Sequence, residues 1–288
     1  MLKIDLKPHL KRFPYWLKQS LKVNSNAKET RLLLHDLQIN TVCQSARCPN
    51  IHDCFSRKRC TFLILGSYCT RSCRFCAVKT EKYLEPPDKR ELFKIRDAVK
   101  RLGMSSAVIT SVTRDDLDDG GAGHFVDCVE ILKEAKVGLN IEVLVPDFLG
   151  KRSSIERIVS AMPHIFSHNV ETVPRLYSKV RPQADYQRSL DVLRYVKELD
   201  ERIFTKSGLM VGLGETRREI YRAMEDLKKA GCDIITIGQY LKPDPCCLEV
   251  EEFFHPEEFA RFSERARGLG FKRSFCSPFA RSSYQRML

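Results

Sequence analysis

The chain has 288 residues, of which 43% are hydrophobic, so it is long enough for one α/β barrel with a sizeable core. No apolar run approaches the roughly 18–20 residues that a membrane-spanning helix needs, and the basic N-terminus lacks the apolar centre of a signal peptide. The formal net charge of +12 favours an acidic partner, either a nucleic acid or an acidic carrier protein. We therefore expect a cytoplasmic protein without a membrane anchor.

The chain contains twelve cysteines. In a cytoplasmic protein this number indicates metal or redox chemistry rather than disulfides. We interpret residues 1–60 as an N-terminal extension whose basic first segment packs on the body of the protein. Residues 61–288 then form one barrel domain that ends in the tail Arg281-Ser282-Ser283-Tyr284, with no linker or internal repeat.

The extension contains the first cysteine triplet, Cys43, Cys48 and Cys54, with gaps of four and five residues. Taken alone, this spacing is ambiguous, because it suits zinc ligands as well as ordinary loop residues.

The second triplet, Cys69, Cys73 and Cys76, follows the apolar run 62–66 and has gaps of three and two residues. Three thiolates on one short loop can hold three irons of a cubane cluster, which leaves the fourth iron open to bind a small molecule. A structural zinc site is normally closed by a fourth ligand and has two-residue gaps. The spacing therefore predicts an iron–sulfur cluster, with zinc or unliganded core thiols as the alternative. The neighbouring Arg71, Arg74 and Lys79 are expected to favour the thiolates.

From residue 61 onward, short β-rich runs alternate with amphipathic stretches. We expect strands at residues 61–66, 107–112, 140–145, 165–170, 206–211 and 234–237, with a weaker one at 271–276. The periodicity predicts helices at residues 94–102, 124–134, 155–160, 186–199, 219–230 and 256–268. Such an alternation defines βαβ units and a parallel sheet. We therefore expect an α/β fold, a partial (β/α)6 barrel, with its chemistry at the carboxyl ends of the strands.

Several sequence blocks resemble, in order, the lipoyl synthase family of radical S-adenosylmethionine (SAM) enzymes. The resemblance runs from about residue 40 to the C-terminus. Its blocks are CQSARCPNIHDC, CTRSCRFCAVKT, TSVTRDDLDDGGAGHF, SHNVETVPRLYSKVRP, TKSGLMVGLGET, ITIGQYL and RSSY.

The resemblance implies two 4Fe–4S clusters. One is a SAM-binding cluster held by Cys69, Cys73 and Cys76. The other is an auxiliary cluster whose ligands are the first triplet together with Ser283. Oxygen is a harder ligand than thiolate, which suits a cluster that must open and give up sulfide. Without the family, the RSSY tail would be interpreted as a solvated end of the chain.

The same resemblance implies contacts to SAM from residues at the strand ends: Phe75, Thr110, Asp115, Asn169, Glu171, Gly212 and Glu215. Ordinary structural roles compete with several of these assignments. Phe75 suits simple packing, and Thr110 and Asp115 precede a turn of the kind that caps helices. Glycines such as Gly212 are common where a strand turns into a helix.

The implied reaction is the insertion of two sulfur atoms at C6 and C8 of an octanoyl chain. A radical formed from SAM removes each hydrogen, so no side chain is needed as an acid or base. The implied partners are an octanoylated lipoyl-carrier domain (a 2-oxoacid dehydrogenase E2 or a glycine cleavage H protein), an electron donor such as flavodoxin or ferredoxin, and an iron–sulfur assembly carrier. No aromatic-basic motif of an RNA-binding module appears, which argues against nucleic acid.

The sequence departs from the family pattern in a few places. Cys246 and Cys247 lie in an unusually acidic segment and are interpreted as inert packing. Cys276 is close enough in sequence to Ser283 to raise alternative ligation of the auxiliary cluster. Cys60, Cys128 and Cys232 are interpreted as small buried hydrophobic residues.

Two rival interpretations remain. Another sulfur-inserting radical SAM enzyme is the nearest competitor, but it would lack the first cysteine triplet and the RSSY tail. The other rival is a non-catalytic iron–sulfur or zinc protein that binds nucleic acid through its positive charge.

Overall fold

The computed structural model describes residues 13–18 and 24–283. Its main feature is a seven-stranded sheet in which every neighbouring pair of strands is parallel. In order across the sheet, the strands are β1 (Thr61–Ile64), β4 (Ser106–Ser111), β5 (Asn140–Leu144), β6 (Ile165–Ser167), β7 (Phe204–Val211), β8 (Ile234–Gln239) and β9 (Arg273–Cys276). All six expected strands are confirmed, and the weaker run at 271–276 forms the seventh.

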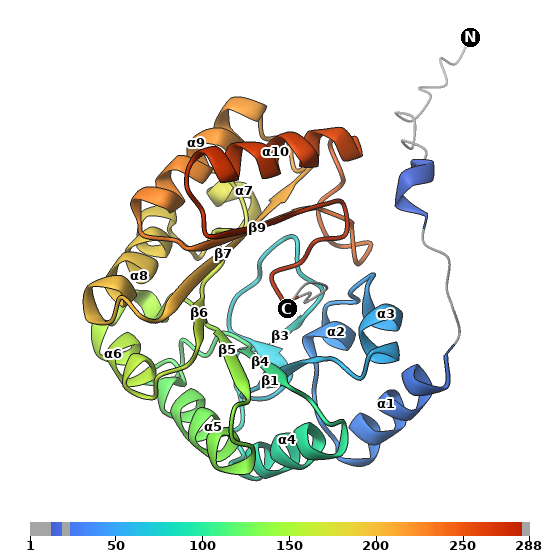
Figure 1. Ribbon diagram of the computed structural model, residues 1–288, viewed down its shortest axis with the longest axis vertical. Helices are drawn as coiled ribbons and strands as arrows, with labels where there is room; N and C mark the ends of the chain where they lie inside the picture. Colours follow the sequence, from blue (N-terminus) through green and yellow to red (C-terminus); the bar gives the residue numbers. More distant parts are fainter. Residues whose placement is uncertain (1–12, 19–23, 284–288) are drawn as a thin grey trace.

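Six helices cover the convex side of this sheet, and β1 and β9 remain unpaired with each other, so the barrel is open (Figure 1). Each helix buries an apolar stripe against the strands, as the amphipathic patterns predict. The helices are α4 (Arg90–Arg101), α5 (Ala122–Ala135), α6 (Arg152–Ser160), α8 (Tyr186–Leu199), α9 (Arg217–Lys229) and α10 (Pro256–Gly268). The expected partial barrel is therefore confirmed.

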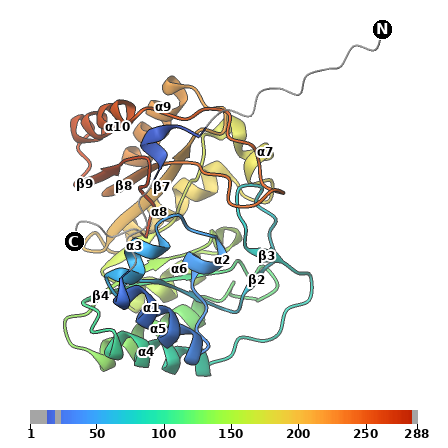
Figure 2. The same cartoon turned by 90° about the vertical axis from the view of Figure 1, so that its right-hand side faces the viewer.

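The N-terminal elements lie on the side of the molecule that faces the viewer in Figure 2. Beside β1 are α1 (Ser25–Asp36), α2 (Val42–Ser45) and α3 (Ile51–Ser56), whereas η1 (Tyr15–Leu17) lies near the start of α10. Thr41 forms an antiparallel bridge with Phe62 of β1, and Leu34 and Phe55 belong to the same apolar cluster as the strands. The first-segment residue Trp16 contacts His255 at the start of α10, with ring centroids 4.9 Å apart.

Short elements gather at the carboxyl ends of the strands. They are β2 (Tyr68–Cys69), β3 (Lys79–Thr80), η2 (Phe148–Gly150), η3 (Pro174–Leu176) and α7 (Tyr177–Val180). After β9 the chain turns into the concave side of the sheet (Figure 1), and Gln239 N donates to Pro278 O at 3.1 Å. None of the helices in the described ranges is long and apolar enough to cross a membrane.

Candidate metal centre and cofactor site

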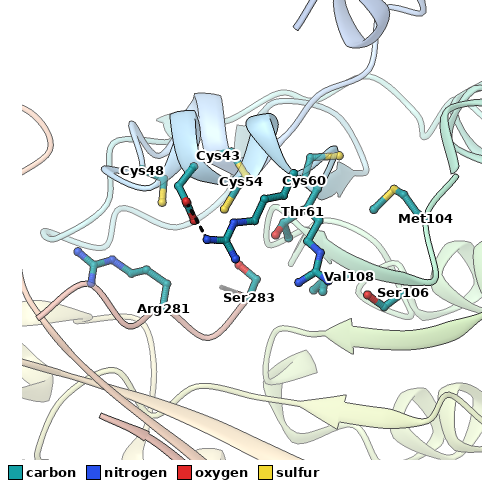
Figure 3. A pocket seen from close by; sticks show the side chains of 13 residues that line it. Cys43, Cys48, Cys54, Cys60, Thr61, Met104, Ser106, Val108, Arg281 and Ser283 are labelled. Carbon is teal, nitrogen blue, oxygen red and sulfur yellow. Dashed lines mark ion pairs between the residues drawn. The ribbon is translucent and has the colours of Figure 1, made fainter. Parts of the chain in front are cut away.

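The first cysteine triplet and Ser283 line one pocket, which we call the thiol pocket (Figure 3). Cys43 comes from α2 and Cys54 from α3, while Cys48 lies between these two short helices. Arg281 and Ser283 reach the pocket from the C-terminal tail. The structure therefore brings together the residues predicted to hold the auxiliary cluster. Tyr284 of the tail lies outside the described residues.

The tail reaches the thiol pocket because it is tied at several points. Asn50, which lies between Cys48 and Cys54, donates from Nδ2 to Phe279 O at 2.7 Å. On the other side, the tail passes directly over Gly238 of β8, where an added Cβ would lie 2.0 Å from Ala280 O. No larger side chain fits there without moving the tail, so this glycine is required by a close approach of two backbones.

Burial raises the pKa of two cysteines of the first triplet. It raises the pKa of Cys43 to about 11, and it also raises the pKa of Cys54, with the charges of Cys43 and Cys48 adding to the effect. Arg57, Arg59 and Arg281 line the same pocket, but burial outweighs them at Cys43 and Cys54, and bound iron would supply the further positive charge that ionises these thiols. The donor set therefore fits a cluster better than a free nucleophile.

A fourth cysteine of the thiol pocket is Cys60, which is 6% exposed. Its expected burial is confirmed, but its place beside Cys43 and Cys54 was not foreseen. Cys276 instead lies in β9 and packs among the apolar residues around α10, outside the residues that line the pocket. The suggestion that Cys276 is an alternative ligand is therefore wrong. Cys60 lines the same pocket as Ser283 and is the cysteine placed to replace it as a ligand.

The second triplet lies on a loop that is held by three other loops at the carboxyl ends of the strands. Thr70 N donates to Thr113 O at 3.0 Å, after β4. Arg74 N donates to Val180 O at 2.9 Å, and Leu248 N donates to Arg74 O at 2.9 Å. The backbone of residues 69–76 is thus fixed by the barrel, and its three cysteines are half-buried.

Burial also dominates the thiols of this loop. It raises the pKa of Cys76 to about 12, and it raises the pKa of Cys73 although Arg181 and Arg71 favour the thiolate there. Arg71 therefore favours the Cys73 thiolate as expected, but burial outweighs it, and no basic residue of the described ranges has this effect on Cys76. Bound iron would supply the positive charge that ionises both thiols.

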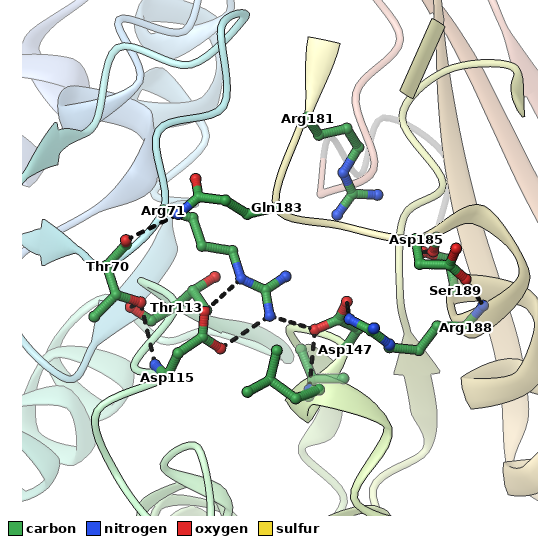
Figure 4. Close-up of polar contacts among 12 residues, drawn as sticks. Thr70, Arg71, Thr113, Asp115, Asp147, Arg181, Gln183, Asp185, Arg188 and Ser189 are labelled. Atoms are coloured by element: carbon green, nitrogen blue, oxygen red, sulfur yellow. Dashed lines mark hydrogen bonds and ion pairs between the residues drawn. The ribbon is translucent and has the colours of Figure 1, made fainter. Parts of the chain in front are cut away.

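Arg71 is the centre of a buried ion-pair network beside the second triplet (Figure 4). The side chain is 4% exposed and donates to both carboxylate oxygens of Asp115, at 2.6 and 2.9 Å, and to Asp147 Oδ1 at 2.6 Å. Burial by itself raises the pKa of Asp147, but hydrogen bonds and charge from Arg71 bring it down to about 2. The Asp115 carboxylate, which the family resemblance assigns to SAM binding, thus already has a partner within the protein.

Asp147 was missed by the sequence reasoning. It follows β5 and is completely buried, and Arg188 approaches its Oδ2 at 3.3 Å. The available signal was its position, because an acidic residue directly after a buried parallel strand lies at the end of the barrel where chemistry collects. Its role in the described structure is to hold Arg71 and, through it, the cysteine loop.

The other predicted SAM contacts have structural partners of their own. Phe75 packs against the small apolar cluster that contains Leu213 and Tyr240. Thr110 Oγ1 donates to Leu144 O of the next strand at 2.8 Å. Glu215 is 4% exposed, and its carboxylate accepts the backbone N–H groups of Gly212 and Leu213.

Gly212 has a steric requirement independent of any ligand. Its φ is +111°, and an added Cβ would lie 2.2 Å from Gln239 Nε2 and 2.6 Å from Glu252 O. A side chain at this position is therefore excluded by both backbone strain and packing.

Asn169 and Glu171 form a pair at the end of β6. Asn169 Nδ2 donates to Glu171 Oε1 at 2.9 Å, and its Oδ1 accepts from Ser282 Oγ at 2.7 Å. Burial raises the pKa of Glu171, although the charge of Arg181 and the hydrogen bond from Asn169 oppose the shift. These two predicted SAM contacts therefore lie together, and the C-terminal tail touches one of them.

Several buried polar atoms near these residues lack a hydrogen-bond partner in the described part of the chain: Ser111 Oγ, His168 Nε2 and Arg181 Nε. His168 Nδ1 lies 2.8 Å from Val145 O and donates to it, which leaves Nε2 as an acceptor. Burial lowers the pKa of His168 to about 4, so the ring is neutral at pH 7. These atoms lie at the ends of β4, β6 and α7, and buried polar atoms without a partner fit a polar ligand such as SAM.

Within the described ranges, no three His, Cys, Asp or Glu side chains lie close enough to share a single metal ion. The cysteines of the first triplet instead line a common pocket. This arrangement fits a cubane cluster, in which each thiolate binds a different iron.

Comparison with known proteins agrees with this chemistry. A model of the radical SAM superfamily matches residues 63–227. The chain is similar over 92% of its length to the solved structure of a methylornithine synthase, with 88% of that chain covered, a TM-score of 0.55 and 15% identity. It is also similar to Streptococcus suis SuiB bound to S-adenosylmethionine, with a TM-score of 0.59 and 13% identity, over 74% of this chain and 49% of that one. At these identities the likeness concerns the fold alone.

Curated relatives define the family more narrowly. The chain is 53% identical to the lipoyl synthase of Caldicellulosiruptor saccharolyticus over 94% of its own length and 95% of the relative. It is 50% identical to that of Caldanaerobacter subterraneus subsp. tengcongensis, over 95% of each chain, and 48% identical to that of Chlorobaculum parvum, over 94% and 92%. The chain therefore belongs to the lipoyl synthase family of the radical SAM superfamily.

Membership of this family confirms several expectations from the sequence: the family itself, a sulfur-inserting radical SAM enzyme, SAM as a cofactor, and two 4Fe–4S clusters. The relatives contradict the rival that placed the chain in a different sulfur-inserting family. They also favour an enzyme rather than a non-catalytic metal protein.

Proposed function

We propose that this protein inserts two sulfur atoms at C6 and C8 of an octanoyl chain attached to a carrier protein, which makes the lipoyl cofactor. The observation that carries the proposal is the thiol pocket, in which three cysteines of the extension and Ser283 of the tail line one space. That donor set suits a cluster with one exchangeable iron, which a sulfur donor requires.

We assign the remaining residues by position. Cys69, Cys73 and Cys76 hold the SAM-binding cluster, and Asn169, Glu171 and the unpaired atoms of His168 and Arg181 bind SAM. When bound, SAM and its cluster supply the radical that removes hydrogen, and the auxiliary cluster supplies the sulfur. The chain orients these groups: Arg71 holds the cysteine loop against Asp115 and Asp147.

For Phe75, Thr110, Asp115, Gly212 and Glu215 we propose a mainly structural contribution to this site. Their polar groups are already satisfied by the protein, or their side chains pack in the core. They hold in place the strand ends and loops that surround the proposed SAM site.

The partner that supplies the octanoyl group is a lipoyl-carrier domain. An E2 subunit or an H protein, a flavodoxin or ferredoxin as electron donor, and an iron–sulfur assembly carrier belong to the same proposal, as does a cytoplasmic location. The net charge of +12 supports steering of an acidic partner to this protein.

The first test is the iron and sulfide content of protein reconstituted without oxygen. We expect about eight irons and eight sulfides per chain. A variant with alanine at all three positions of either triplet should lose about half of each. Only four irons in the unsubstituted protein, or zinc in place of iron, would remove the sulfur donor.

The second test is the conversion of an octanoyl-lysine peptide. The unsubstituted protein should form the dithiolated product with SAM and a reductant. The variant without the first triplet should still cleave SAM but leave the octanoyl chain without sulfur. Sulfur insertion by that variant would contradict the assignment of the auxiliary cluster.

A further inference from the structure

Ser282 and Ser283 are adjacent in sequence but face different parts of the molecule. Ser283 lines the thiol pocket, whereas Ser282 Oγ donates to Asn169 Oδ1 at 2.7 Å. Asn169 is itself oriented by Glu171, to which its Nδ2 donates at 2.9 Å. One short stretch of backbone therefore connects the thiol pocket with the residues at the end of β6.

The sheet is shaped to accept this stretch. At Gly208 of β7, an added Cβ would lie 2.1 Å from Ser282 Oγ and 2.8 Å from Asn169 Oδ1. Gly208 and Gly238 lie on neighbouring strands, and both leave room for the tail where any side chain would collide with it. The position of Ser282 is thus set by its hydrogen bond to Asn169 and by the space above Gly208, while Gly238 leaves room for Ala280 of the same tail.

We propose that Ser282 is a positioning residue, whose hydrogen bond to Asn169 holds Ser283 in the thiol pocket and thereby links the auxiliary cluster to the SAM end of the barrel. The inference rests on the proposed role of Ser283 as a cluster ligand. Loss of one such hydrogen bond changes the balance between the anchored and the released tail by about two- to tenfold. The serine-bound iron should become more labile by the same factor.

The test uses the full chain reconstituted with ⁵⁷Fe, without any turnover. Mössbauer spectroscopy measures the fraction of iron in the oxygen-bound position, and a chelator measures the rate at which that iron is lost. In Ser282→Ala we expect a smaller fraction and a rate about two- to tenfold higher, whereas Ser282→Thr, which keeps the hydroxyl, should approach the unsubstituted protein. Ser153→Ala, an exposed serine of α6, is the matched control and should change neither.

Asn169→Leu tests the link from the other end. It should increase the rate of loss of the same iron as Ser282→Ala does. The double variant should lose this iron no faster than either single variant, since both changes delete the same hydrogen bond. Gly208→Ala should act in the same direction by displacing Ser282, with Gly268→Ala as its control, because nothing lies within 4 Å of an added Cβ there.

Ser283→Ala separates the two possible failures. If it loses the oxygen-bound iron while Ser282→Ala keeps it unchanged, the positioning role is overturned and the proposed function stands. If Ser283→Ala itself leaves the spectrum unchanged, Ser283 is not a ligand, and both the assignment and this inference fall. Additive effects of Ser282→Ala and Asn169→Leu would overturn the link between the two ends.

Discussion

The two cysteine loops carry three thiols each, but they are completed by different parts of the molecule. The loop at 69–76 presents all its predicted ligands within eight residues, and the barrel only fixes its backbone. The thiol pocket combines two short helices of the extension with a tail from the far end of the chain. The ligands that we propose for the SAM-binding cluster therefore form a local motif, whereas those proposed for the auxiliary cluster are brought together only by the tertiary structure.

The largest expected effect comes from substituting a cysteine in each triplet and comparing SAM cleavage with sulfur insertion. Cys73→Ala should abolish SAM cleavage, whereas Cys48→Ala should retain it and lose sulfur insertion, because the loops hold different clusters. The measurement is 5′-deoxyadenosine formed against dithiolated product. Cys128→Ala, a fully buried cysteine of α5, is the control and should retain both activities. Loss of SAM cleavage in Cys48→Ala would mean that the clusters are not independent.

The next effect concerns the anchoring of the 69–76 loop. Arg71→Met should destabilise the protein without clusters by about 3–5 kcal/mol, because the buried Asp147 loses its main partner. Denaturant unfolding measures the change. Arg90→Met removes an exposed pair with Asp88 and should leave the midpoint unchanged. Equal effects of the two substitutions would show that burial of the network contributes nothing.

The same network predicts a dependence of stability on pH. The pKa of Asp147 is about 2 in the folded protein, below its value of about 3.9 in an unfolded chain. The folded state is therefore favoured by about 3 kcal/mol above about pH 5, and this contribution is lost progressively as the pH falls from about 5 to about 1. Asp147→Asn should flatten that part of the stability curve. An unchanged acid limb in the variant would refute the assignment.

The smallest expected effect concerns the fourth thiol of the thiol pocket. Cys60→Ala should leave the iron and sulfide content unchanged if, as we propose, Ser283 rather than Cys60 completes the site. Iron analysis and the Mössbauer spectrum check this outcome. Loss of iron in Cys60→Ala, with none in Ser283→Ala, would reverse the assignment and make the auxiliary site resemble an all-thiolate cluster.

Much of the fold was predictable because the signals are local. Each strand is a short β-rich run and each outer helix has an amphipathic repeat, so their order along the chain predicted a parallel, partial barrel. The spacing of Cys69, Cys73 and Cys76 likewise predicted a cluster loop without reference to the rest of the chain.

The partners of single side chains were not predictable in the same way. Asp147 shares Arg71 with Asp115, and no local pattern marks that contact between residues that lie after different strands. Cys276 is nearer to Ser283 in sequence than Cys60 is, yet of these two only Cys60 lines the thiol pocket. Which loop ends meet depends on the curvature of the whole sheet.

The order of the strands and helices, the three-cysteine loop and membership of the family could all be predicted from the sequence, because each depends on short stretches of neighbouring residues. The tertiary structure alone decided that Ser283 faces the cysteines of the extension and that Ser282 faces Asn169. The physical reason is close packing: the tail can cross β7 and β8 only where Gly208 and Gly238 leave space for its backbone.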